Sequence, residues 1–136
     1  MLTREQAYAA KIYAQVISEI APMAPAKQKK YGSMAHKLPV LIRVAGLAQA
    51  LQFVESRGSN EHRRLLKHLA LTLDYTDDGG DNAPTAEAKM LAESRTLGIA
   101  AYMHLTQRAL TALQWYKRFA QSVLKVEAGD QADNIQ

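Results

Sequence analysis

The 136-residue sequence contains no cysteine, and its 13 acidic residues are outnumbered by 17 lysines and arginines. Without cysteine the chain can form no disulfide, no zinc–thiolate site and no thiol nucleophile. No window approaches the roughly 18 uninterrupted apolar residues of a membrane-spanning helix. The first residues carry charges of both signs and lack the apolar run of a signal peptide. We therefore expect a soluble, cytoplasmic protein that is not bound to a membrane.

The composition is that of a folded globular protein, with 48% hydrophobic and 22% charged residues. A chain of this length fits one domain. We expect a single helical domain over residues 1–127. The remainder, 128–136, is polar and is predicted to be a frayed tail.

The spacing of apolar residues predicts an all-α fold, a compact bundle of about six helices. Apolar side chains recur at steps of three and four, and no alternation of period two is long enough for a strand. The predicted helices cover residues 3–21, 26–38, 40–54, 60–75, 84–94 and 97–127. The third, which Pro39 opens, is apolar at 11 of its 15 positions and is expected to be the central helix. The last is the longest.

Local signals set several of these boundaries. Thr3 and Gln6 have the spacing of a capping box, which places the first helix start at Thr3. Pro22 ends that helix, because proline cannot continue the backbone hydrogen bonds. Gly58 is expected to end the third helix and Ser59 to cap the fourth.

No catalytic pattern is present. The sequence lacks a nucleophile elbow, a phosphate-binding glycine loop and a two-histidine zinc helix. The four histidines lack ligand spacing, so we expect them to be surface or structural residues. They are His36, His62, His68 and His104. The chain is therefore predicted not to be an enzyme and to bind no cofactor.

An acidic loop over residues 76–83 is the one region that suggests a metal. Four aspartates lie in or beside it, namely Asp74, Asp77, Asp78 and Asp81. A helix–loop–helix calcium site needs oxygen ligands at alternate positions and a glutamate at the twelfth. Counted from Asp74, the third position is Thr76 and the twelfth is Thr85, so the pattern fails. We interpret the segment as a solvated acidic loop without a metal.

Two long stretches carry basic residues and no acid. The first, 21–54, contains Lys27, Lys29, Lys30, Lys37 and Arg43, and the second, 94–126, contains Arg95, Arg108, Lys117, Arg118 and Lys125. Stretches of one charge sign create a field that attracts polyanions such as nucleic acids. The alternative is that these residues only form hydrated helix surfaces and keep the protein soluble.

Nothing in the sequence suggests that bases are read. There is no zinc finger, recognition-helix signature or aromatic platform motif, so any nucleic acid is expected to be bound through its phosphates. Tyr31, Trp115 and Tyr116 are the aromatic residues that stacking on bases would use. Tyr116 lies in the apolar stripe of the last helix, which favours a core position for it.

Two segments resemble the small helical subunit, the fifth, of the type III-B CRISPR effector called the Cmr complex. They are Lys30-Tyr31-Gly32-Ser33 with Leu38–Ile42 and Gly46–Phe53, and Thr106–Leu110 with Trp115–Ala120. Ala45 departs from the family pattern, which carries a polar residue there. The resemblance covers nearly the whole chain apart from the acidic loop and the tail.

The resemblance implies a non-catalytic subunit in antiviral defence. In this family several copies stack along the complex beside the backbone subunits, their basic faces line the groove that holds guide and target RNA, and RNA cleavage belongs to the backbone subunit. The expected partners are both RNAs, other copies, and other Cmr subunits, especially the backbone and large subunits. The candidate RNA-binding residues are Lys29, Lys30, Lys37, Arg43, Lys117, Arg118 and Lys125.

Two hypotheses stay open at this point. Stacking needs two different faces that complement each other, and the acidic residues Asp77, Asp78 and Asp81 with one basic surface would supply such a pair. The alternative function is a helical protein–protein interaction module that makes no direct contact with nucleic acid.

Overall fold

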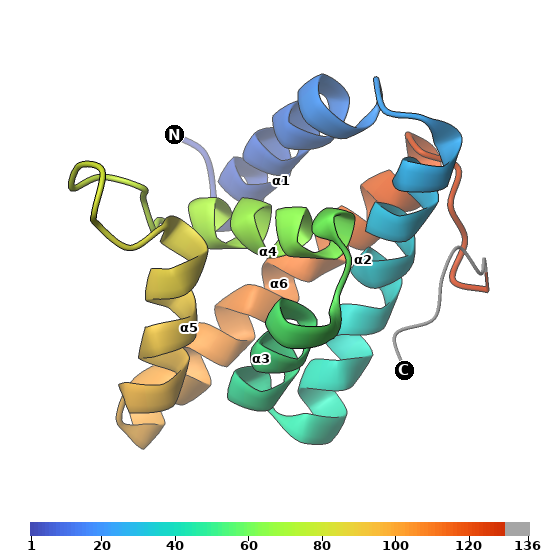
Figure 1. Ribbon diagram of the computed structural model, residues 1–136. Helices are drawn as coiled ribbons and strands as arrows, with labels where there is room; N and C mark the ends of the chain where they lie inside the picture. Colours follow the sequence, from blue (N-terminus) through green and yellow to red (C-terminus); the bar gives the residue numbers. More distant parts are fainter. Residues whose placement is uncertain (130–136) are drawn as a thin grey trace.

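The computed structural model describes residues 1–129, and within them the chain is helical apart from short connections and one longer loop (Figure 1). The helices are α1 (Arg4–Gln15), the π-helical segment η1 (Val16–Ile20), α2 (Pro25–Ala45), α3 (Leu47–Arg57), α4 (Asn60–Thr72), α5 (Ala86–Thr96) and α6 (Ile99–Ser122). No strand occurs in this part of the chain, and the predicted all-α fold is confirmed. Most of the predicted polar tail, 128–136, lies outside the described residues.

Side-chain caps begin three of the helices. Thr3 and Gln6 form the predicted capping box, with Gln6 N donating to Thr3 Oγ1 at 3.0 Å and Thr3 N to Gln6 Oε1 at 2.8 Å. Ser59 caps α4 as predicted, and the imidazole of His62 completes a second capping box by accepting from Ser59 N at 3.0 Å. Thr85 Oγ1 caps α5. These caps satisfy amide groups that have no partner inside the helix.

The prediction that Pro39 opens a separate helix is wrong, because α2 runs through Pro39 and ends at Ala45. Proline inside a helix lacks one hydrogen bond and costs about 3 kcal/mol. Burial of Pro39 and its neighbours Leu38 and Ile42 in the core outweighs that cost. The break falls instead at Gly46, whose φ of 90° is a conformation that favours glycine.

The apolar segment 40–54 is consequently divided between α2 and α3, and it is not enclosed on all sides. Val40 and Val44 at the end of α2 are 54% and 81% exposed. The central position belongs to α2 as a whole, which packs against α3, α4, α6 and η1. This helix therefore contacts elements from both the N-terminal and the C-terminal half of the sequence.

The last helix is shorter than predicted at both ends. Gly98 is its N-cap and Ser122 its last residue, whereas the sequence predicted a helix over 97–127. Leu105, Ala109 and Tyr116 of its apolar stripe are buried. After Ser122 the chain turns back towards α2. Lys125 has a φ of 60°, which permits this turn.

A buried polar network ties α1, α4 and α6 together. The hydroxyl of Tyr116 donates to Gln15 Oε1 at 2.6 Å and lies 3.0 Å from Thr72 Oγ1. Gln15 Nε2 donates to the backbone oxygen of His68 at 3.1 Å and to Thr72 Oγ1 at 3.2 Å. Burial raises the pKa of the Tyr116 phenol. The hydroxyl therefore keeps its proton and acts as a donor in the core.

A second network joins α2 to α4 and η1. Tyr31 Oη lies 2.7 Å from His68 Nδ1, and His68 Nε2 lies 3.2 Å from a carboxylate oxygen of Glu19. Arg64 pairs with the same carboxylate at 3.3 Å. Burial lowers the pKa of His68, an effect that its bond to Glu19 opposes, and burial raises the pKa of Tyr31. A neutral imidazole that accepts from Tyr31 and donates to Glu19 satisfies all three groups.

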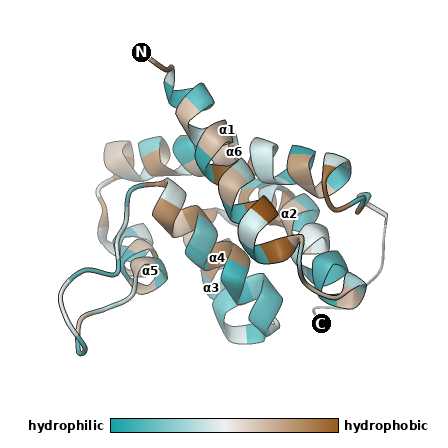
Figure 2. Ribbon diagram, turned by 90° about the horizontal axis from the view of Figure 1, so that it is seen from above, coloured by the Kyte–Doolittle hydropathy of each residue, from teal (hydrophilic) through white to brown (hydrophobic). Residues whose placement is uncertain are grey.

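Among residues 1–129, no helix has both the length and the apolar character needed to cross a bilayer. Figure 2 shows apolar and hydrophilic residues alternating along the helices and mostly hydrophilic residues along the loop between α4 and α5. In Figures 1 and 2 this loop and the segment that follows α6 lie at opposite ends of the molecule.

Candidate nucleic-acid interface

The seven predicted RNA-binding residues come from two helices that pack against each other. Lys29, Lys30, Lys37 and Arg43 lie on α2, Lys117 and Arg118 lie on α6, and Lys125 follows α6. Because α2 packs along α6, the fold brings together two basic stretches that are about 70 residues apart in the sequence. The candidate residues of α2 span 14 positions, which is about 21 Å along a helix. They therefore form a stripe and not a compact cluster.

Contacts of Val126 hold the end of the second stretch against α2. His36 Nε2 lies 2.9 Å from the backbone oxygen of Val126. The side chain of Val126 rests on Gly32, where an added Cβ would lie 2.7 Å from Val126 Cβ. Lys125, the residue before, is thereby held beside α2 and is exposed. The glycine of the Lys30–Ser33 segment has a packing role that the sequence did not reveal.

None of the seven candidate cations forms an ion pair or a side-chain hydrogen bond within residues 1–129. Other cations do have such partners, namely Lys11, Arg63, Arg64, Lys67, Lys89, Arg95 and Arg108. A cation without a partner keeps its full field for an external anion. The basic residues thus fall into one set bound within the fold and one set without such partners among residues 1–129.

Arg108 shows why this distinction matters. It belongs to the second acid-free stretch, yet its guanidinium donates to Tyr8 Oη at 3.1 Å and to the Leu73 backbone oxygen at 3.2 Å, and it pairs with Asp74 at 3.4 Å. Arg95 of the same stretch donates to Gln52 Oε1 at 3.5 Å. Both arginines serve the packing of helices. The free charge of this stretch is confined to its C-terminal third.

A shallow depression on α6 lies among free cations. Its volume is about 220 Å³, and it is lined by Gln114, Lys117, Arg118 and Gln121. These positions follow the i, i+3, i+4, i+7 pattern of one helix face. The ammonium, the guanidinium and the NH₂ groups of the two amides can all donate hydrogen bonds to an anion. The amide oxygens are the only acceptors among these four side chains. Gln114 and Gln121 were not predicted as binding residues, although their spacing from Lys117 and Arg118 places them on the same helix face.

The aromatic residues are less available than the sequence suggested. Tyr31 and Tyr116 are fully buried, so neither can stack on a base. The core position predicted for Tyr116 is confirmed. Trp115 is half-buried and lies 5.8 Å from the ring of Phe119, which in turn contacts Tyr13 at 5.3 Å between centroids. This aromatic cluster fastens α1 to α6, and phosphate contacts remain the main chemistry that this face offers.

Three of the four histidines have structural partners, as predicted. His36 binds the backbone near the C-terminal end, His62 completes a helix cap, and His68 lies in a buried network. His104 is exposed on α6.

The acidic loop is anchored to the fold by Asp77. One oxygen of its carboxylate accepts from the backbone N–H of Ala86 at 2.7 Å, and the other pairs with Lys67 at 3.3 Å. The bond from Ala86 and the nearby lysines lower the pKa of Asp77. Lys89 Nζ donates to the backbone oxygen of Asp78 at 3.2 Å. Asp78 and Asp81 are exposed. The loop that carries them lies at the opposite end of the molecule from the segment after α6 (Figure 1).

Comparison with known proteins identifies the family. A sequence model of the family described as "CRISPR-associated protein (Cas_Cmr5)" matches residues 4–123, from the start of α1 to the end of α6. The chain belongs to the Cmr5 family. The resemblance to the fifth subunit of the type III-B Cmr complex is therefore confirmed.

A relative from Thermus thermophilus is similar over nearly the whole chain. "CRISPR system Cmr subunit Cmr5" of Thermus thermophilus is 40% identical over 126 residues, which are 92% of this chain and 99% of the relative. A crystal structure of a Cmr5 family protein from the same organism superposes with a TM-score of 0.78 at 40% identity. That superposition covers 90% of this chain and 98% of the other. The six-helix arrangement described above is thus the Cmr5 fold.

Proposed function

We propose that this Cmr5-family chain is a non-catalytic structural subunit that binds the backbones of guide and target RNA within the type III-B complex. The RNA would lie against the surface formed by α2, α6 and the segment after α6. The residues proposed to contact phosphates are Lys29, Lys30, Lys37, Arg43, Lys117, Arg118 and Lys125.

The observation that carries this proposal is the absence of internal partners for all seven cations within residues 1–129. By contrast, Arg108 and Lys89 are held by acceptors of the fold. A cation that already has an acceptor in the fold gains little free energy from a phosphate. A cation without one can bind a phosphate and release the counterions of the RNA. Arg4 on α1 and Arg57 on α3 also lack such partners, but the larger number of partner-free cations lies on α2, α6 and the segment after α6.

The chemistry of this surface favours binding without sequence preference. Lys117 and Arg118 lie beside two glutamine amides in the depression on α6, and all four offer donors that suit phosphate oxygens. Tyr31 and Tyr116 are buried and offer no stacking surface. A scaffold that holds a guide–target duplex of any sequence needs contacts of this kind.

We also propose that copies of the chain stack head to tail, beside the backbone and large subunits. Asp78 and Asp81 are exposed in the loop between α4 and α5, and Lys125 is exposed in the segment after α6. This loop and this segment lie at opposite ends of the molecule (Figure 1). Opposite charges at opposite ends suit a heterologous contact between copies. Asp77 is excluded from this role because it caps α5 and pairs with Lys67.

Stacking is tested by changing Asp78 and Asp81 to lysine and measuring assembly of the complex by sedimentation. We expect complexes with fewer copies of the chain, while its far-UV spectrum is unchanged. Assembly with the full number of copies would refute the acidic loop as a stacking contact.

RNA binding is tested by replacing Lys30, Lys37, Lys117 and Arg118 with glutamate in the assembled complex. We expect the affinity for target RNA to fall by about 100-fold or more at about 0.15 M salt, because several phosphate contacts become repulsive. Arg118→Glu alone should also weaken binding. Its matched control is Arg57→Glu, because Arg57 is an exposed arginine at the end of α3, outside the proposed surface. Unchanged affinity of the fourfold variant would leave the alternative function, a protein–protein interaction module without RNA contact.

A further inference from the structure

Trp115, the only tryptophan in the sequence, lines a second depression beside the one that contains Lys117 and Arg118. The volume of this Trp115 depression is about 480 Å³, and Glu5 in the first turn of α1 lines its other side. Gln114 and Arg118 line both depressions, so the two lie side by side along α6. Its size is in the range of about 300–1,000 Å³ that small ligands occupy.

The part of Trp115 that reaches this depression is hydrocarbon. The indole is half-buried, and its Nε1 is among the buried atoms. Because the N–H group is buried, the atoms that the ring exposes are carbons. The ring lies 5.8 Å from that of Phe119 at an angle of 32°, and this packing holds it in place. A flat ligand therefore finds an aromatic surface that is already ordered.

The two depressions differ in charge. The depression on α6 has two cations, Lys117 and Arg118, and no carboxylate, and neither cation has an internal partner within residues 1–129. The Trp115 depression has one cation, Arg118, and one carboxylate, Glu5, so its charges balance. An anion is favoured in the first and an uncharged group in the second. The carboxylate of Glu5 can also accept a hydrogen bond from an N–H group of that uncharged part.

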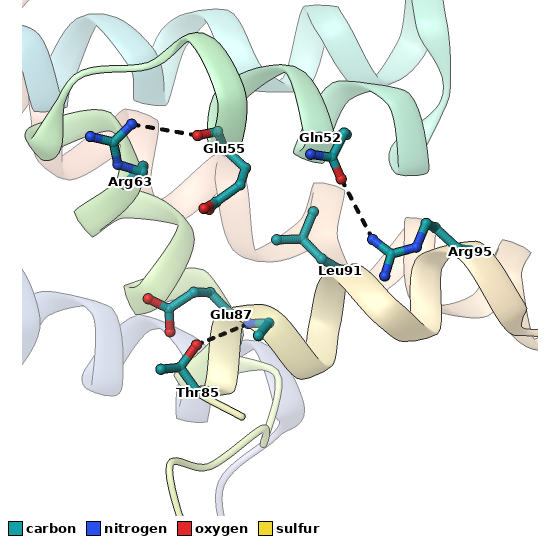
Figure 3. Close-up of a pocket in the computed structure, with 8 residues that line it drawn as sticks. Gln52, Glu55, Arg63, Thr85, Glu87, Leu91 and Arg95 are labelled. Carbon is teal, nitrogen blue, oxygen red and sulfur yellow. Dashed lines mark hydrogen bonds between the residues drawn. The ribbon is translucent and has the colours of Figure 1, made fainter. Parts of the chain in front are cut away.

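The pocket between α3, α4 and α5 lacks this combination (Figure 3). Its volume is about 400 Å³, and two arginines lie beside Glu55 and Glu87, but its lining residues include no aromatic side chain. Figure 3 shows both arginines directed to oxygen atoms of α3, Arg63 to the backbone oxygen of Glu55 at 3.4 Å and Arg95 to Gln52 Oε1 at 3.5 Å. This pocket therefore offers neither a free cation nor a ring surface.

A nucleotide has the groups that the two adjoining depressions suit, an anion and a flat, uncharged base joined by one sugar. Trp115 and Arg118 are three residues apart, which places them on one helix face about 4.5 Å apart along the axis. Stacking on an aromatic side chain needs no particular base, because every base has a π-face. A base inside a duplex is covered on both faces by its neighbours, so only an unpaired base can stack here.

We propose that the base of an unpaired RNA nucleotide stacks on Trp115 while Lys117 and Arg118 hold its phosphate. Glu5 repels phosphate from the Trp115 depression and so orients the nucleotide. The inference rests on the proposed function and deepens it, because the same surface gains affinity for single-stranded RNA without reading its sequence.

The first test uses the isolated full chain, whose single tryptophan reports on its own surroundings by fluorescence. We expect oligouridine to quench this fluorescence saturably. An abasic oligomer of the same length, with ribose and phosphate but no bases, should bind without quenching. It should also bind at least about fivefold more weakly with the same salt dependence, because stacking of one base is worth about 5- to 150-fold in affinity. No saturable quenching, or equal affinity for the two oligomers, would overturn the proposal.

The second test compares variants by the anisotropy of labelled oligouridine. Trp115→Leu should bind at least about fivefold more weakly, with an unchanged slope of log K against log salt, because stacking releases no counterions. Trp115→Phe keeps a ring and should recover most of the lost affinity. Tyr13→Leu is the matched control, because Tyr13 contacts Phe119 in the same aromatic cluster but lines neither depression. Equal losses in Tyr13→Leu and Trp115→Leu would contradict a specific contact with Trp115.

The inference and the proposed function fail in different ways. If glutamine at Lys117 and Arg118 lowers the salt slope while Trp115→Leu binds RNA normally, phosphate binding stands and stacking is refuted. If those glutamines leave the slope unchanged, phosphate binding by this surface is refuted, and the stacking proposal that rests on it falls too. Poor incorporation of Trp115→Leu into the reconstituted complex, with unchanged affinity for RNA, would assign the Trp115 depression to a protein subunit and overturn the inference.

Discussion

Replacing Gly32 by alanine should destabilise the protein, contrary to the usual effect of this change inside a helix. Alanine is favoured over glycine in a helix by about 1 kcal/mol. Here, however, the new Cβ would lie 2.7 Å from Val126 Cβ and 2.9 Å from Val126 Cγ1. The segment after α6 must therefore move away from α2.

The magnitude follows from what that movement removes. Exposing the buried side chain of Val126 costs about 1.5–3 kcal/mol. Loss of the bond between His36 and the Val126 backbone costs about 0.5–1.5 kcal/mol. After subtraction of the gain in helix propensity, we expect Gly32→Ala to lower the free energy of unfolding by about 1–3 kcal/mol.

The assay is urea unfolding followed by far-UV circular dichroism, and a second background makes it decisive. In a chain carrying Val126→Gly the obstructing side chain is absent, so the same Gly32→Ala change should stabilise by about 1 kcal/mol. The sign of the effect thus reverses between the two backgrounds. Stabilisation by Gly32→Ala in the unmodified chain would refute the packing of Val126 on α2.

Two further predictions concern the buried networks. Tyr116→Phe removes the hydroxyl that bonds to Gln15 and Thr72, and it should lower the free energy of unfolding by about 1–3 kcal/mol in the same urea assay; a loss below about 0.5 kcal/mol would contradict the network. Because burial lowers the pKa of His68 below its ordinary value of 6.5, the unfolded chain binds more protons than the folded one just below that pH. The contribution of His68 to stability should therefore be complete above about pH 6.5 and decrease as the pH falls through the range below it. His68→Gln should flatten this part of the curve of stability against pH, and an unchanged slope would show that another group is responsible.

The elements that local rules govern were predictable from the sequence. The capping box at Thr3 and the cap at Ser59 depend on side chains within three residues of the backbone groups that they satisfy. The position of the break near Gly46 was not predictable, because local rules assign it to Pro39. Only the packing of α2 in the core shows that this proline is tolerated.

That the candidate site is basic was predictable from the sequence, but which basic residues are free to bind an anion was not. Arg108 and Arg118 belong to one acid-free stretch, and no local pattern reveals that Arg108 has partners within the fold. The distinction depends on Tyr8, which bonds to Arg108 from 100 residues away. The pocket with Glu55 and Glu87 likewise joins helices that the sequence does not show to be neighbours. Contacts between residues far apart in the chain decide which charges are free, and these contacts require the fold.

The central claim, that free cations on α2 and α6 bind RNA phosphates, is tested most directly by the salt dependence of binding. The isolated chain and its variant with Lys30, Lys37, Lys117 and Arg118 changed to glutamine are compared with single-stranded and duplex RNA of unrelated sequences. We predict a linear fall of log K with log salt for the unmodified chain and a slope smaller by about 3 in the variant, since each phosphate contact contributes about 0.7–0.9. The same slope for both proteins would contradict the account.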